Sequence, residues 1–136
     1  MYTVQDITTL RRFIGASQMK TLLANTLGEE GEWFNAKLAE LANLVRTMPK
    51  IYEQDGLGDA AVVHLHYFKG SSDFYITERD TSEVQHQAFG KADLGYGAEW
   101  GYISIAEIIQ AGVELDLHFT PRTMASIRKG NGEGLK

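Results

Sequence analysis

The chain has 136 residues, of which 43% are hydrophobic and 23% are charged, as is usual for one globular domain with its own core. It contains no cysteine, which excludes disulfides, a thiol nucleophile and cysteine-ligated zinc. Its 18 acidic and 13 basic residues give a formal charge of -5, which does not favour binding along a phosphate backbone. No apolar run approaches the roughly 20 residues of a membrane span, and the N-terminus does not resemble a signal peptide. We therefore expect a single cytoplasmic domain over residues 1–136 that makes no membrane contact.

Residues 1–52 are predicted to form a helical layer. Thr3 and Asp6 have the spacing of a capping box at the start of a first helix, and Ser17 can cap a second. A third helix is the most strongly periodic and is followed by Pro49 as a stop; its apolar positions are Phe34, Leu38, Leu41, Val45 and Met48.

Residues 60–120 are predicted to form an antiparallel sheet of about five strands. Apolar and polar residues alternate over 60–68, 73–78, 85–93, 99–104 and 113–119. Ser104 and Glu107 have capping spacing for a short helix over 104–111, and Thr120 with Pro121 indicates another over 122–129. A frayed tail is expected over the glycine-rich residues 130–136.

The predicted architecture is therefore an α+β fold. The N-terminal helices pack on one face of the sheet, and short helices lie between and after the last strands. We expect the third helix to supply the main apolar stripe, against Phe74, Ile76, Leu115 and Leu117.

The stretch "AFGKADLGYGAEWGYISIAEI", residues 88–108, combines glycines with aromatic side chains. Gly95 and Gly97 lie between two predicted strands, where a positive φ favours glycine. Gly90 and Gly101 lie within strands, which indicates a bulge or a close approach of two backbones.

Aromatic residues gather around this turn in the predicted sheet; they are Phe74, Tyr75, Phe89, Tyr96, Trp100 and Tyr102. Buried rings would belong to the core, whereas exposed rings would stack on bases or anchor a protein partner. We expect Asp93, Glu99 and Tyr102 to maintain the turn and strand geometry, while Tyr96 and Trp100 present a functional surface.

The candidates for catalysis are weaker. His64 and His66 have metal-ligand spacing on a strand, and His118 with Asp116 could complete a site, but no second metal motif supports one. Neither a nucleophile elbow nor a phosphate-binding loop is present. The sequence therefore leans away from an enzyme and predicts neither a metal nor another cofactor.

A resemblance to a known family is carried by four segments in order: "FYITERD", "AFGKADLG", "EWGYISIAEI" and "ELDLHFTP". Over residues 60–121 they resemble a family of domains of unknown function that are encoded mainly on plasmids, integrative elements and prophages. The matching positions are Thr77, Glu78, Asp80, Phe89, Gly90, Asp93, Gly95, Glu99, Gly101, Tyr102, Ser104, Glu107, Asp116 and Phe119.

The resemblance implies a context rather than a reaction, namely accessory genes of mobile elements that serve conjugation, antirestriction or defence. We therefore expect a non-enzymatic accessory protein that binds a protein partner. The candidate binding residues are Tyr75, Glu78, Asp80, Tyr96 and Trp100. The alternatives are a nucleic-acid-binding module that uses the aromatic cluster with Lys69, Arg79 and Lys91, and a metal-dependent enzyme that uses His64, His66 and His118.

Overall fold

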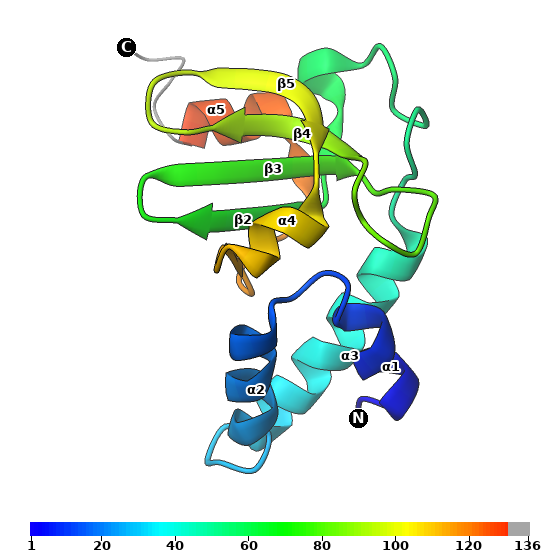
Figure 1. Ribbon diagram of the computed structural model, residues 1–136, viewed down its shortest axis with the longest axis vertical. Coiled ribbons are helices and arrows are strands. Elements are labelled where there is room, and N and C mark those ends of the chain that lie inside the picture. The colour runs from blue at the N-terminus through cyan, green and yellow to red at the C-terminus, as the bar shows by residue number, and fades with distance from the viewer. Residues whose placement is uncertain (131–136) are drawn as a thin grey trace.

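The computed structural model describes residues 1–130 and confirms the α+β fold (Figure 1). The helices are α1 (Val4–Leu10), α2 (Ala16–Asn25), α3 (Gly31–Thr47), the 3-10 helix η1 (Gly58–Ala60), α4 (Ile105–Gln110) and α5 (Met124–Gly130). The strands are β1 (Val62–Val63), β2 (Leu65–Lys69), β3 (Ser72–Glu78), β4 (Ala88–Asp93), β5 (Ala98–Ile103), β6 (Glu114–Leu115) and β7 (Arg122–Thr123). The predicted frayed tail lies, apart from Gly130, outside the described residues. None of the helices in the described part of the chain is long and apolar enough to cross a membrane.

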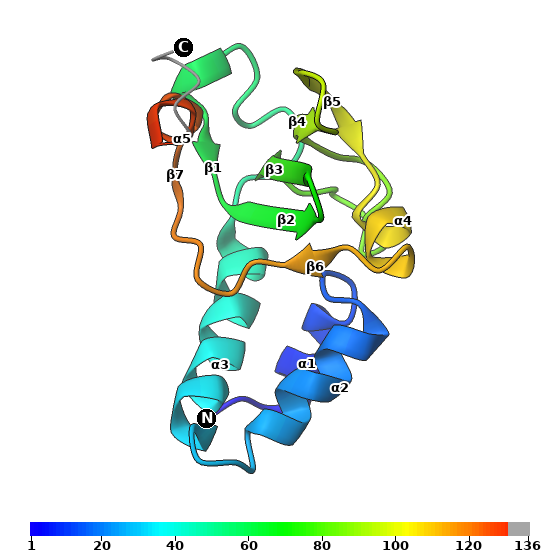
Figure 2. The ribbon, with the colours of Figure 1, turned by 90° about the vertical axis from the view of Figure 1, so that its left-hand side faces the viewer.

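The five-stranded sheet has the order β5-β4-β3-β2-β6, and every neighbouring pair is antiparallel, as predicted. Helices α1, α2 and α3 lie together beyond the edge of the sheet that β2 and β6 form (Figures 1 and 2). Helix α4 and helix α5 lie on opposite sides of the sheet (Figure 2). We call the side that contacts the N-terminal helices and α4 the inner face, and the side that contacts α5 the outer face.

The main core joins the helices to the inner face. The predicted stripe of α3 contributes Leu38, Leu41 and Val45, and Phe74, Ile76, Leu115 and Leu117 belong to the same cluster, as expected. Tyr67 of β2 is fully buried there, and its hydroxyl donates a 2.6 Å hydrogen bond to the carbonyl oxygen of Phe13. Because burial disfavours the phenolate, it raises the pKa of Tyr67 far above the ordinary value. Tyr67 thereby attaches the turn after α1 to strand β2.

A smaller core lies on the outer face. Val63, Met124 and Ile127 are buried there, with Tyr75 and Phe119 packed against them. This cluster attaches α5 to β1 and β3 and covers part of the outer face.

The predicted strand over 60–68 is divided between two sheets. Val62 and Val63 pair with β7, whereas Leu65 begins β2 of the main sheet. Simple alternation would place Val63 and Leu65 on one face, yet Val63 joins the outer core and Leu65 the inner core. Val63 is buried against α5, whereas Leu65 is buried against the N-terminal helices. The chain therefore passes from the outer face to the inner face at His64.

The predicted strand over 113–119 is also shorter than expected. Pairing ends at Leu115, because the Asp116 carboxylate accepts a hydrogen bond from the backbone N–H of His118 and turns the chain. Phe119 consequently packs with the outer core, although alternation placed it beside Leu115.

Two predicted helix starts are wrong by a few residues. Helix α2 begins at Ala16 after Gly15, so Ser17 lies inside its first turn and is not its cap. Helix α5 begins at Met124 rather than at 122, because residues 122–123 pair with β1 instead. The capping patterns of Thr3 with Asp6 and of Ser104 with Glu107 are confirmed.

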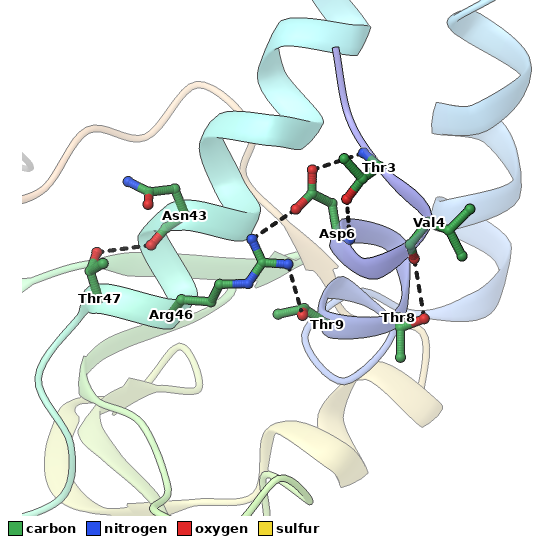
Figure 3. Close-up of polar contacts among 8 residues, drawn as sticks. All are labelled: Thr3, Val4, Asp6, Thr8, Thr9, Asn43, Arg46 and Thr47. Atoms are coloured by element: carbon green, nitrogen blue, oxygen red, sulfur yellow. Dashed lines mark hydrogen bonds and ion pairs between the residues drawn. The ribbon is translucent and has the colours of Figure 1, made fainter.

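Asp6 connects α1 to α3 (Figure 3). Its carboxylate accepts the backbone N–H of Thr3 at 2.9 Å and pairs with the Arg46 guanidinium at 2.8 Å. Arg46 also donates to the Thr9 hydroxyl. The Thr3 backbone bond and, after it, the hydrogen bond from Arg46 lower the pKa of Asp6 below its ordinary value of 3.8.

We predict that Asp6→Asn lowers the free energy of unfolding by about 1 kcal/mol at pH 7, the usual scale of a helix-capping interaction. A lowered folded-state pKa contributes stability above the ordinary value of 3.8, and this contribution is lost as the pH falls through the folded-state value. The difference between the two proteins should therefore shrink in urea titrations run from pH 7 towards pH 3. Glu29→Gln, which removes the same charge from an exposed position, is the control. A difference that does not change with pH would contradict this role.

Gly90 lies where two backbones approach closely, as its position within a predicted strand indicated. A Cβ atom at Gly90 would lie 1.9 Å from the carbonyl oxygen of Tyr75, whereas one at its cross-strand partner Gly101 would meet no atom within 4 Å.

We therefore predict that Gly90→Ala destabilises the fold by about 2 kcal/mol or more, because β3 or β4 must shift. Gly101→Ala should change stability by no more than about 0.5 kcal/mol, since the added methyl group has open space. Chemical denaturation of the matched pair measures both. Equal losses in the two variants would contradict the close approach.

Candidate functional site

An aromatic surface lies on the outer face at the β5 edge of the sheet. Phe89 of β4 is paired with Tyr102 of β5, and Lys91 is paired with Trp100. The Phe89 ring stacks on Trp100 at 5.9 Å between centroids and meets Tyr102 edge-to-face at 5.7 Å. Trp100 is 37% exposed and Tyr102 is 59% exposed, although both are large side chains of a folded sheet. These rings are a surface feature rather than core, unlike Tyr67 on the inner face.

The segment after α3 forms a wall beside these rings. It is pinned to the end of β3 by two backbone hydrogen bonds, from Arg79 N–H to the Pro49 carbonyl and from Ile51 N–H to the Arg79 carbonyl, both 2.9 Å. Glu78 continues the attachment, because its buried carboxylate accepts the backbone N–H groups of Tyr52 at 2.9 Å and Gln54 at 2.6 Å.

Gln54 then fastens the far end of the wall. Its side-chain amide donates to the carbonyl oxygens of Val62 and Thr77, and its amide oxygen accepts the Val62 N–H. Tyr52 adopts a positive φ of 76°, which is uncommon for a residue with a large side chain. The contacts of Glu78 and Gln54 on either side therefore hold a backbone conformation that the local sequence does not favour.

An open pocket of about 230 Å³ lies between this wall and the outer face. Four rings line it, from Tyr52, Phe89, Trp100 and Tyr102, together with the carboxyl-bearing residues Asp55 and Glu78. The remaining lining residues are Ile51, Gln54, Gly56, Gly58, Ala61 and Thr77. We call this set the aromatic pocket.

A pair of hydroxyl groups bridges the aromatic pocket. The Tyr52 and Tyr102 oxygens lie 2.9 Å apart, although the two residues are 50 positions apart in the chain. This hydrogen bond raises the pKa of Tyr102, and the negative charges of Asp55 and Glu78 add to the effect. The pocket is therefore an electronegative environment with aromatic walls.

Tyr96 lies at the tip of the β4–β5 turn, where the sequence placed it. It is 86% exposed, and Gly95 and Gly97 on either side have positive φ angles of 103° and 124°. Asp93 accepts the N–H of Gly95 and so maintains the turn, as expected. Tyr96 does not line the aromatic pocket, whereas Trp100 does, so the two predicted surface residues belong to different parts of the molecule.

Other predicted binding residues contact their own chain. The Asp80 carboxylate accepts the backbone N–H groups of Ser82 and Gln87. The Glu78 carboxylate likewise accepts backbone N–H groups of the wall of the pocket. Tyr75 stacks on the His66 ring at 4.8 Å between centroids. The carboxylates of Asp80 and Glu78 are therefore occupied by backbone groups of their own chain, and the Tyr75 ring packs within the outer face.

The three candidate metal ligands are not brought together. His66 lies between two carboxylates, with Nε2 at 2.7 Å from Asp73 and Nδ1 at 2.9 Å from Asp116. His118 stacks on Trp33 of α3, and the Nδ1 atom of His64 is buried without a hydrogen-bond partner. Burial lowers the pKa of His64, which favours its neutral form. Within residues 1–130, no group of three histidine, aspartate or glutamate side chains is placed to share a metal ion.

Comparisons with protein-family models, with curated proteins and with solved structures found no match.

Sequence reasoning missed Gln54 and Asp55 because residues 53–59 have the composition of a linker, and it missed Tyr52 because this residue was assigned to the end of the helical layer, residues 1–52. Their place in the site depends on contacts with Glu78 and Tyr102, and no local pattern encodes contacts over such separations. The only signal in the sequence was a large aromatic residue directly before an Asp- and Gly-rich segment.

We predict that Glu78→Gln destabilises the fold by roughly 1–3 kcal/mol, because an amide cannot accept both backbone hydrogen bonds as a carboxylate does. Amide hydrogen exchange of residues 52–57 should become faster than in the wild type. Glu99 was expected to maintain the strand geometry, but it is exposed on β5 and its carboxylate forms no hydrogen bond or ion pair within the described residues. Glu99→Gln, which removes the same charge, is therefore the control. Unchanged exchange in the Glu78 variant would show that the wall does not depend on this carboxylate.

Proposed function

We propose that this protein is a non-enzymatic binding module that captures a segment of a protein partner on its aromatic surface. The observation that supports the proposal is the exposure of Trp100 and Tyr102 beside a pocket walled by Tyr52. Tyrosine and tryptophan are the residues most often found at the energetic centre of protein interfaces. Exposed rings around a concave site are costly for solubility unless a partner covers them.

Charge favours a protein partner over a nucleic acid. Asp55 and Glu78 line the aromatic pocket, and carboxylates repel phosphate groups. Lys91, whose ammonium group lies 5.6 Å from the centre of the Trp100 ring, is the basic residue next to the rings. Nucleic-acid binding is therefore the competing outcome of the crosslinking test.

The cellular role that we propose is that of an accessory protein of a mobile genetic element, acting in the cytoplasm. Its support is the ordered resemblance over residues 60–121. Four of the positions that carry the resemblance line the aromatic pocket, namely Thr77, Glu78, Phe89 and Tyr102. These four positions belong to the sheet side of the pocket, whereas its wall, residues 51–57, precedes the segment that carries the resemblance.

Site-specific photocrosslinking tests the proposal. A photoreactive phenylalanine analogue placed at Tyr102 or Trp100 should give a discrete protein adduct in cells that naturally carry the gene. The same analogue at Leu27, which is 90% exposed after α2, is the matched control and should not give that adduct. The Tyr96 position tests whether the turn tip belongs to the same interface.

The chemical composition of the adduct distinguishes protein binding from nucleic-acid binding. An adduct destroyed by protease and resistant to nuclease supports protein binding. A nuclease-sensitive adduct, or adducts from Leu27 alone, would contradict the proposal.

A further inference from the structure

We propose that the aromatic pocket receives the cationic end of a basic side chain, with arginine preferred over lysine, from the protein partner. This inference rests on the proposed function, because it specifies the chemistry of the group that the same site binds. Three properties of the pocket support it: its ring walls, its charge and its size.

The ring walls favour a cation. The faces of tyrosine, phenylalanine and tryptophan carry negative electrostatic potential, and a cation within about 6 Å of a ring centre is attracted to it. The Trp100 ring already makes this interaction within the chain, since the ammonium group of Lys91, a residue that does not line the pocket, lies 5.6 Å from its centroid. Tyr52, Phe89 and Tyr102 supply further rings around the cavity, so a bound guanidinium group could stack on one ring and face another.

The charge of the residues that line the pocket also favours a cation. Asp55 is exposed at the pocket and Glu78 is buried at its base, while no lysine or arginine of the described residues lines it. The Glu78 carboxylate is already occupied by two backbone N–H groups. Asp55 is therefore the carboxylate available to a ligand, and Glu78 contributes through its field.

The size of the pocket restricts the ligand. Pockets for whole drug-sized ligands occupy roughly 300–1,000 Å³. The 230 Å³ of the aromatic pocket is smaller and suits the end of one side chain. Because the pocket lies beside β5, the edge strand of the sheet, the rest of a partner segment can continue along the protein surface.

Two small probes test the cation preference directly. N-acetyl-arginine methylamide carries the guanidinium group, and N-acetyl-citrulline methylamide is its neutral counterpart of nearly equal shape. Each is titrated into the isotope-labelled full chain while NMR follows the indole N–H of Trp100 and the backbone amides of residues 54–58. We expect the arginine probe to bind about fivefold more tightly or better, in line with a cation–π contact supported by one exposed carboxylate.

A matched pair of charge variants locates the effect. Asp55→Asn should weaken the arginine probe about threefold or more and leave the citrulline probe unchanged. Glu99→Gln removes an equal charge from β5, but its position alternates with Trp100 and Tyr102, so it lies on the opposite face and should change neither affinity appreciably. Trp100→Leu should weaken the arginine probe while thermal melting shows a folded chain.

Equal affinity for the two probes, tighter binding of citrulline, no detectable binding of either, or indifference to Asp55→Asn would each overturn the inference. These failures are distinguishable from failure of the proposed function. A protein adduct at Tyr102 without a preference for arginine retains protein binding and removes the cationic ligand. Specific arginine binding without any protein adduct removes the protein partner and retains the pocket chemistry.

Discussion

The carboxylate of Glu78 is the contact on which the site depends. It lies at the end of β3 after the irregular pairing between Ile76 and Glu78, and it accepts two backbone N–H groups from a segment more than twenty residues earlier. Without these two hydrogen bonds, nothing would compensate for the unfavourable positive φ of Tyr52. A buried acid that serves its own backbone thus creates the wall of a pocket, and the pocket brings Tyr52 to Tyr102.

The two faces of the sheet differ in exposure because different elements of the same chain cover them. The inner face meets the helices through a continuous apolar cluster, which buries Tyr67, Ile76 and Leu115 almost completely. The outer face is covered by α5 only around Val63 and Tyr75. At the β5 edge the rings of Phe89, Trp100 and Tyr102 are left with a pocket above them. Because the outer face is covered incompletely, its rings at the β5 edge form an exposed aromatic surface, whereas the covered inner face forms the core.

The same alternation of residues that predicted the sheet could not separate these two outcomes. Trp100 and Tyr102 were expected on one face, and they are, but whether that face is buried depends on where α5 and the segment 51–57 lie. Alternation also failed at His64 and after Leu115, where the chain exchanges one hydrophobic cluster for another. In each case the sequence keeps its alternation of apolar and polar residues, and a contact between residues distant in sequence determines which face of the sheet a side chain occupies.

The features that could be predicted from the sequence are local: the apolar stripe of α3, the caps of α1 and α4, the antiparallel strands, and glycines where φ is positive or backbones meet. These features follow from hydrophobic periodicity, short-range hydrogen bonds and backbone sterics, all of which act within a few residues. Long-range packing makes a segment with the composition of a linker the wall of a pocket, and it places Asp116 against His66, while within residues 1–130 the candidate ligands His64 and His118 are not grouped with them around a metal position. These contacts join residues 24 to 50 positions apart, so the packing of the whole chain, and no nearby pattern, sets which groups meet.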